Sequence, residues 1–216
     1  MSAQKTPESI HLVHHPVVKH KLTMLRDENT SPHNFRLITE EIAQFLAYEA
    51  TRDLKLADRE ITTPMEKTVG QVAGEDLVLV SVMRAGLGML GGMLRTLPFA
   101  TVGHLGIYRD KFIHATVKYY LRLPKSVQGK KVLLLDPMLA TGDTACAAID
   151  RLKEFDVGTI RLVCILAARE GIARVRENHP DVEIVTCSIE RALNDKGYLL
   201  PGLGDAGDRL YDTVEA

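Results

Sequence analysis

The sequence predicts an α/β fold, with helices on both faces of a mostly parallel sheet. Nearly continuous apolar runs at residues 77–82, 131–135 and 160–167 are typical of strands buried on both faces. Helix-forming segments alternate with these runs, and this alternation is characteristic of parallel sheets. With 216 residues, 45% of them hydrophobic and 25% charged, the chain is long enough to bury a core without disulfides or a structural metal.

The charge balance excludes several classes of partner. The 27 Lys and Arg residues against 28 Asp and Glu residues leave a formal net charge of -1. General binding to nucleic acid or to an anionic membrane needs a basic surplus, so we expect neither. No stretch approaches the roughly 18 apolar residues of a membrane span, and the first residues lack the apolar core of a signal peptide. Cys146, Cys164 and Cys187 lie far apart in apolar segments, which indicates a reduced, cytoplasmic protein with buried thiols.

We expect one domain over residues 1–216, with an N-terminal arm at residues 1–30. The arm is polar and rich in His, and its apolar side chains have no obvious core role, which favours a homo-oligomer. A helix should follow, because Ser31 is a good N-cap and Pro32 suits the first helical position. Apolar residues recur at helical spacing over residues 35–45.

Strands and helices should then alternate to the end of the chain. Pro64 and Gly70 interrupt a weak apolar pattern, so residues 62–71 are expected to form a loop or short strands. The predicted strands are 77–82, 101–107, 116–123 (alternating enough for an edge hairpin), 131–135, 160–167 and 182–187, and the predicted helices are 87–96, 144–155 and 172–177. Ligands of such sheets bind beyond the carboxyl ends of the strands.

The segment 132–144 carries the most information about chemistry. An apolar strand delivers Asp136 to the sheet edge, and the chain then enters a helix through the Thr-Gly-Asp-Thr of residues 141–144. Backbone N–H groups at a helix start, together with Thr hydroxyls, suit a phosphate monoester. A carboxylate one loop away can accept hydrogen bonds from vicinal hydroxyls, so the pair suits a ribose 5-phosphate. The alternative is a plain strand, a capped helix and a surface aspartate. The segment is neither a Walker P-loop nor a dinucleotide fingerprint.

Residues 136–142, Asp-Pro-Met-Leu-Ala-Thr-Gly, resemble the phosphoribosyl-diphosphate motif of the type I phosphoribosyltransferases, and in particular that of the uracil phosphoribosyltransferase family. That larger family usually has two acidic residues in tandem, whereas Pro137 follows Asp136 here. Further segments similar to the uracil family are residues 15–22, 48–51, 84–89, 108–110 and 197–208. The resemblance covers about residues 11–212.

The resemblance implies a type I phosphoribosyltransferase fold with a small hood over the site. It also implies a pyrimidine salvage reaction in which uracil and 5-phosphoribosyl 1-diphosphate (PRPP) give UMP and diphosphate. Mg2+ would assist, held mainly by substrate oxygens and water, with Asp205 acting through water and no direct protein ligand. Some members of the family are activated by GTP, so GTP is a candidate effector.

The same resemblance implies roles for individual residues. Arg84 and Arg109 would clamp the diphosphate through their guanidinium forks, Asp136 would hold the ribose hydroxyls, and Asp205 would lie beside the metal-diphosphate and the base. The PRPP contacts implied are Arg84, Arg109, Asp136, Pro137, Met138, Leu139, Ala140, Thr141, Gly142, Asp143, Thr144 and Asp205, and the uracil contacts are Leu199, Gly204, Asp205 and Ala206. The alternatives are solvated loop arginines and a Gly-rich loop that only packs on the sheet.

Three departures from the family pattern bear on activity. Asp143 stands where the family usually has an uncharged residue, Arg169 stands where it usually has Pro, and residues 111–114 lack the usual acidic residues. Three other functions therefore stay open: a phosphoribosyltransferase for a purine, a non-enzymatic nucleotide or RNA binder, and an inactive paralogue. Purine enzymes generally stack the base on an aromatic side chain, for which Tyr198 is the nearby candidate. RNA binding would call for a basic face with interleaved aromatics, and only 5% of the residues are aromatic.

Overall fold

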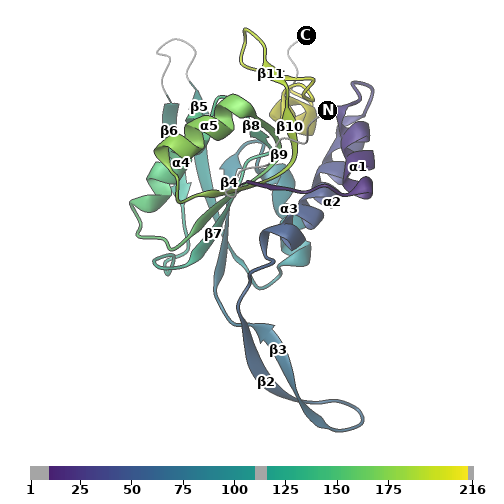
Figure 1. Cartoon of the computed structure of the whole chain (residues 1–216), viewed down its shortest axis with the longest axis vertical. Coiled ribbons are helices and arrows are strands. Elements are labelled where there is room, and N and C mark those ends of the chain that lie inside the picture. Colours follow the sequence, from purple (N-terminus) through teal and green to yellow (C-terminus); the bar gives the residue numbers. More distant parts are fainter. Residues whose placement is uncertain (1–9, 110–115, 214–216) are drawn as a thin grey trace, which may run out of the picture.

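The structure, a computed structural model, describes residues 10–109 and 116–213, and at 108, 109 and 116–118 it describes the backbone alone. The strands of its main sheet are β1 (Ile10–Leu12), β4 (Leu77–Met83), β5 (Thr101–Arg109), β6 (Thr116–Arg122), β7 (Lys131–Leu135), β8 (Met138–Leu139), β9 (Ile160–Ala168) and β10 (Glu183–Glu190). They lie in the order β1-β10-β9-β7-β4-β5-β6, and β8 also pairs with β9 (Figure 1). Among these described strands, β5 and β6 pair antiparallel and the other pairs are parallel. The predicted mostly parallel sheet with an antiparallel edge is confirmed.

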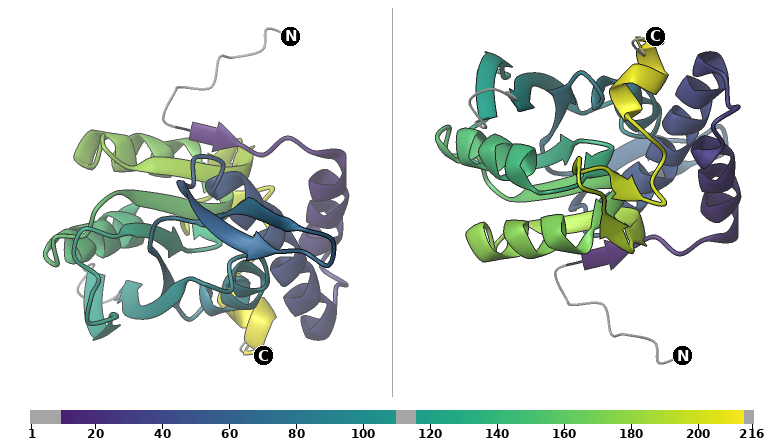
Figure 2. Two further views of the ribbon diagram at one scale, coloured as in Figure 1. Left: turned by 90° about the horizontal axis from the view of Figure 1, so that it is seen from below. Right: turned by 90° about the horizontal axis from the view of Figure 1, so that it is seen from above.

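Helices cover both faces of the sheet, as the continuous apolar runs predicted (Figure 2). The helices are α1 (Pro16–Arg26), α2 (Pro32–Ala50), α3 (Leu87–Thr96), α4 (Asp143–Lys153), α5 (Arg169–Asn178) and α6 (Ala206–Tyr211). Within β4, Leu77 and Leu79 pack into one hydrophobic cluster with α1, α2, α3 and α6, whereas Val78 and Val80 pack into another with α4 and α5. Successive side chains of a strand point to opposite faces, so both faces need apolar residues.

Local patterns predicted several element boundaries correctly. The helix α3 and the strand β7 have the predicted bounds, 87–96 and 131–135. The hydroxyl of Ser31 accepts a hydrogen bond from the Asn34 N–H at 3.3 Å, which caps the start of α2.

The N-terminal arm does have a role in the core, contrary to the sequence-based expectation. Val18, Leu22 and Leu25 of α1 are buried, and they pack in the same cluster as the apolar face of α2. Helical spacing brings these three side chains to one face, and His15 caps the helix by accepting a hydrogen bond from the Val17 N–H. These three residues therefore give no support for an oligomer, whereas Val17 and Met24 on the same helix are exposed.

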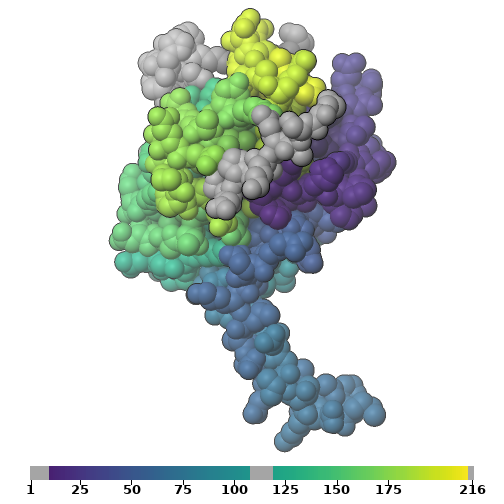
Figure 3. Space-filling view, in the orientation of Figure 1, coloured from purple at the N-terminus to yellow at the C-terminus, as the bar shows by residue number. Residues whose placement is uncertain are grey.

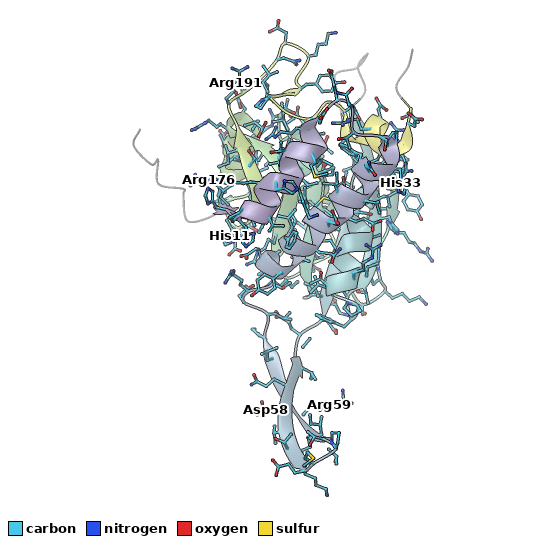
Figure 4. The ribbon with its side chains drawn as sticks, turned by 90° about the vertical axis from the view of Figure 1, so that its right-hand side faces the viewer. His11, His33, Asp58, Arg59, Arg176 and Arg191 are labelled. Atoms are coloured by element: carbon cyan, nitrogen blue, oxygen red, sulfur yellow. The ribbon has the colours of Figure 1, made fainter. Side chains whose placement is uncertain are left out.

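Residues 56–73 form a long two-stranded hairpin rather than a loop or short strands. β2 (Leu56–Thr62) pairs antiparallel with β3 (Lys67–Ala73), and the hairpin projects away from the body of the protein (Figures 1 and 3). Asp58 and Arg59 mark it in Figure 4. The turn Thr63–Glu66 takes up Pro64, and Gly70 stays in register opposite Arg59, so neither residue breaks the strands.

Two of the three thiols are buried as predicted. Cys164 and Cys187 lie in the core, and Cys146 is half-buried. Within the described ranges, no helix combines the length and the apolar character that crossing a bilayer requires.

Candidate active site

A crevice of about 220 Å³ opens where the chain leaves β4 and β7, beyond their carboxyl ends. It is lined by Ala85, Asp136, Met138, Ala140, Gly197, Tyr198, Leu199, Gly204, Asp205, Ala206 and Gly207. This is the edge at which ligands of parallel α/β sheets bind. The crevice brings together two segments, 136–140 and 197–207, that lie about 60 residues apart in the sequence.

Asp136 follows β7 directly and reaches the crevice as the sequence predicted. Its carboxylate accepts a hydrogen bond from the Met138 N–H at 3.2 Å. Burial raises the pKa of the Asp136 carboxyl to about 6, because removal from water disfavours the charged form more than this one hydrogen bond favours it. Above that pH the carboxylate is an acceptor for hydroxyl groups, and below it the protonated form loses acceptor capacity.

The segment 140–144 forms a tight loop between β8 and the start of α4. Gly142 caps the helix in the left-handed region, with φ of +89°. A Cβ at Gly142 would lie 3.1 Å from the Cβ of Arg174 and from the carbonyl oxygen of Gly171, so backbone conformation and space both favour glycine. The first N–H groups of a helix have no partner within the helix, so the loop ends in a group of donors suited to an anion.

The carboxylate of Asp143 is turned toward neighbouring donors. It accepts a hydrogen bond from the Thr141 hydroxyl at 2.9 Å and forms an ion pair with Arg174 of α5 at 2.7 Å. The repulsion that Asp143 would exert on a phosphate is therefore offset by a guanidinium beside it. The other departure, Arg169, is the first residue of α5.

Arg84 lies at the turn after β4, next to the C-terminal segment. Its guanidinium donates to Asp208 Oδ1 and to Thr213 Oγ1, each at 3.2 Å, and its carbonyl oxygen accepts from the Tyr211 hydroxyl. The side chain is half exposed, and the neighbouring Ala85 lines the crevice. A cation with this exposure can exchange its partners for an anionic ligand.

The four predicted uracil contacts all line the crevice. The small strands β11 (Ala192–Leu193) and β12 (Leu199–Leu200) pair, and an irregular loop leads from them into α6. Leu199, Gly204, Asp205 and Ala206 face the crevice from this segment. Asp205 caps α6 by accepting a hydrogen bond from the Asp208 N–H at 3.0 Å.

Two predicted PRPP contacts are built into the core. Leu139 is 2% exposed and packs among apolar residues beneath the loop. Pro137 is buried, and its carbonyl oxygen accepts hydrogen bonds from the N–H groups of Ile165 and Leu166, both at 3.0 Å. Neither residue lines the crevice, and the pairing of β8 with β9 fixes the loop at this point. That Pro137 and Leu139 contact PRPP stays a prediction.

Arg109 is the last residue of β5, and its side chain lies outside the described residues. The same holds for residues 111–114, which were expected in the hood.

The sequence analysis missed one contributor to the site, Arg174. Arg174 reaches the carboxylate of Asp143 only because the turn from β9 into α5 carries the helix over the loop of residues 140–144. Tyr198, which the sequence offered only as a stacking residue for a purine base, also lines the crevice.

Two carboxylate residues from different segments, Asp136 and Asp205, line the crevice. Across residues 10–109 and 116–213, no group of three or more His, Cys, Asp or Glu side chains is arranged to hold a metal ion. A cation here would need additional ligands from a bound anion or from water.

Comparison with known sequences points to one family. The model for the family "Uracil phosphoribosyltransferase" matches residues 12–213. The chain is 53% identical to a uracil phosphoribosyltransferase of Finegoldia magna over 92% of this chain and 96% of that one. It is also 52% identical to a uracil phosphoribosyltransferase of Myxococcus xanthus over 94% of this chain and 96% of that one.

Solved structures agree on the fold. The AQ2163 protein of Aquifex aeolicus superimposes with a TM-score of 0.91 at 39% identity, covering 96% of this chain and 100% of that one. An adenine phosphoribosyltransferase of Trypanosoma brucei, at 13% identity and a TM-score of 0.57, covers 95% of this chain and 92% of that one. At that identity the likeness concerns the fold alone, and it is the fold of the type I phosphoribosyltransferases.

Proposed function

The chain belongs to the uracil phosphoribosyltransferase family, and on this premise we propose that its crevice binds PRPP and uracil and joins them to form UMP. In this pyrimidine salvage reaction the bond between C1 of the ribose and the diphosphate oxygen breaks, and a bond from C1 to a ring nitrogen of uracil forms. Diphosphate leaves with the bonding electrons, and uracil loses its ring N–H proton.

One observation carries the proposal: a single crevice is lined by Asp136, by Ala140 at the start of the phosphate loop (residues 140–144), and by the base loop (residues 199–206). The 5-phosphate would lie on residues 140–144, where Gly142 and the start of α4 present backbone donors. Asp136 would accept hydrogen bonds from the ribose hydroxyls. Uracil presents acceptor, donor and acceptor groups along one edge, which the backbone of Leu199 and of residues 204–206 can read.

Catalysis in this site would rest on positioning and on charge. As the C1–O bond breaks, positive charge develops on the ribose and negative charge on the diphosphate. Arg84, with its partly exposed guanidinium, is placed to neutralise the diphosphate, and Arg109 is proposed as the second clamp. Holding two substrates in line within one crevice removes much of the entropic barrier to their reaction.

Mg2+ is proposed as the cofactor. Asp136 and Asp205 both line the crevice and supply hard oxygen atoms, which suits a cation that is coordinated mainly by phosphate oxygens and water. The bound ion would neutralise part of the diphosphate charge. Asp205, as the cap of α6, is held in place to orient a water molecule toward such an ion.

A second copy of the chain is the proposed partner of the β2–β3 hairpin. The exposed apolar side chains of the hairpin are Leu56, Ile61, Met65, Val69 and Val72, of which Met65 is 91% exposed. A lone two-stranded hairpin is marginally stable in water, and these side chains contact water along both faces. Association with a copy of this chain would bury them, so we propose a homo-oligomer. Activation by GTP and a cytoplasmic location stay predictions from the sequence.

The reaction is tested directly with the purified protein. Uracil, PRPP and Mg2+ are mixed, UMP is followed by chromatography, and cytosine, hypoxanthine and xanthine are assayed in parallel, with and without GTP. Product from uracil alone is expected. Nucleotide formed from hypoxanthine or xanthine would instead favour a purine enzyme with Tyr198 beside the base, and no product from any base would contradict the proposal.

A further inference from the structure

A partly buried ion pair joins the N-terminal helix to the base loop. The guanidinium of Arg26, at the end of α1, donates to both carboxylate oxygens of Glu190, at 2.8 and 2.6 Å. Glu190 ends β10 and is 2% exposed. The hydroxyl of Ser188 donates to the same carboxylate at 2.7 Å. Sequence analysis singled out none of these residues.

The pair holds both main-chain groups of one residue in the base loop. Gly202 donates its N–H to Glu190 Oε2 at 2.9 Å, and its carbonyl oxygen accepts from Arg26 Nη1 at 2.7 Å. Gly202 has φ of +62°, and a Cβ there would lie 2.1 Å from the carbonyl oxygen of Leu199. The turn is therefore specified by backbone geometry and fixed in place by two charged side chains.

The charges of Arg26 and Glu190 fit a role in holding the base loop better than a role in stability alone. A buried carboxylate is costly unless it is paired and fully hydrogen-bonded. Although burial alone would raise the pKa of Glu190, the hydrogen bonds from Arg26, Ser188 and Gly202 hold that pKa below its usual value. Glu190 is thus kept as an anion, with donors from α1, β10 and the base loop converging on it.

A second arginine repeats the connection from the opposite direction. Arg209 of α6 donates to the carbonyl oxygens of Leu25 and Asp27 at the end of α1, and to that of Leu203 in the base loop. Its guanidinium also lies 4.4 Å from the centre of the Phe35 ring, in the adjoining helix α2. The end of α1 is therefore attached to the base loop at Gly202 through Arg26 and at Leu203 through Arg209.

We propose that Arg26 and Glu190 are positioning residues for base recognition: through Gly202 they set the backbone of residues 199–206 in the shape that reads the uracil edge. The inference rests on the proposed function of that loop. Main-chain donors and acceptors discriminate between bases only when their positions are fixed, and a displacement of about 1 Å is costly. The Arg26–Glu190 pair supplies that rigidity from outside the crevice.

The test compares Arg26→Lys and Glu190→Gln with the wild-type chain. Lysine keeps the charge but lacks the fork that reaches Glu190 and Gly202 together. Glutamine keeps the shape of Glu190 but places an NH₂ group where an acceptor is needed. Glu183→Gln is the matched control, because Glu183 begins the same strand and is ion-paired with Arg161 at the other end of it.

For both variants we expect KM for uracil to rise about tenfold or more, while KM for PRPP stays within about twofold. Amide hydrogen exchange at residues 199–204 should accelerate in both, with or without substrates, and Glu183→Gln should change none of these quantities. Even if Glu190→Gln fails to fold, Arg26→Lys is expected to fold, because the Arg26 side chain is partly exposed.

Three results would overturn the inference: unchanged KM for uracil in folded Arg26→Lys, an equal rise in both KM values, or unaltered exchange at 199–204. Failure of the proposed function is distinguishable, since it shows as absence of UMP from the wild-type chain.

Discussion

Arg174 of α5 lies 2.7 Å from the carboxylate of Asp143, the residue that follows the capping glycine of the phosphate loop. An acidic residue at the start of a helix is favourable for the helix, but it opposes the binding of a phosphate at the same place. The ion pair with Arg174 offsets the charge of Asp143, so Asp143 can favour the helix without opposing a bound phosphate. The loop consequently depends on a residue about 30 positions away in the sequence.

Loss of Arg174 should weaken PRPP binding. Arg174→Ala leaves the Asp143 charge less compensated, so we expect KM for PRPP to rise about fivefold at low ionic strength and less at high salt. Adding Asp143→Asn should restore most of the loss. Arg176→Ala, on the same helix (Figure 4), is the control and should have little effect. Equal effects of the two arginine variants would show that only the total charge matters.

Activity should require the ionised form of Asp136. Burial raises the pKa of this carboxyl to about 6, so kcat/KM for PRPP should fall as the pH drops through 6. Asp136→Asn keeps the shape, removes the charge and should lower activity at every pH. A pH profile of initial rates from pH 5 to 8 measures this. If the asparagine variant bound PRPP and turned over like the wild type, the role assigned to Asp136 would be wrong.

The same carboxyl should cost stability at neutral pH. Its folded pKa of about 6 lies above the ordinary 3.8, so between these values the native state retains a proton that the unfolded chain has released. Stability contributed by this group is lost as the pH rises through that window, by up to about 3 kcal/mol. Asp136→Asn should therefore unfold at a higher temperature than the wild type at pH 8, and the gap should shrink by pH 5. A constant gap would contradict this account.

Arg84 should matter far more for PRPP than other exposed arginines. Removing a donor that meets charge developing in the transition state typically costs roughly 100-fold in rate, and we expect that loss in kcat/KM for Arg84→Ala. Arg95→Ala is the matched control, because Arg95 is also half exposed and ion-paired, with Glu40 of α2. Similar kinetics for the two variants would remove Arg84 from the diphosphate site.

The β2–β3 hairpin should hold the oligomer together. Light scattering after size exclusion should give a mass well above the 23.9 kDa of one chain. The double change Ile61→Lys and Val69→Lys, which places a charge on each face of the hairpin, should shift the protein toward the monomer. Leu37→Lys, an exposed leucine on α2, should leave the mass unchanged. A wild-type monomer, or a double variant that stays associated, would contradict the proposal.

Much of the fold could be predicted because its determinants are local. The run 131–135 is apolar at every position but its first, which predicts a strand buried on both faces, and Ser31 with Pro32 marks the start of α2. The hairpin was misjudged for a local reason as well. Pro64 falls in its turn, and Gly70 pairs in register, so residues that usually interrupt strands did not interrupt these.

The candidate site was predictable where chemistry and chain order coincide. Asp136 and residues 141–144 follow one buried strand, so the sequence alone placed a carboxylate beside the loop that we propose to bind phosphate. The sequence did not distinguish residues that face the crevice from Pro137 and Leu139, which face the core. That distinction depends on β8 pairing with β9.

By itself the sequence determined the sheet, the family and the residues that we propose to meet the substrates. The tertiary structure alone decided what holds those groups in place. Arg26 contacts Glu190, which is 164 positions away in the sequence, and Gly202, which is 176 positions away. No periodicity or motif extends over such sequence separations. Local patterns record what each segment prefers, whereas these contacts exist only because helices and loops from opposite ends of the chain pack on the same sheet.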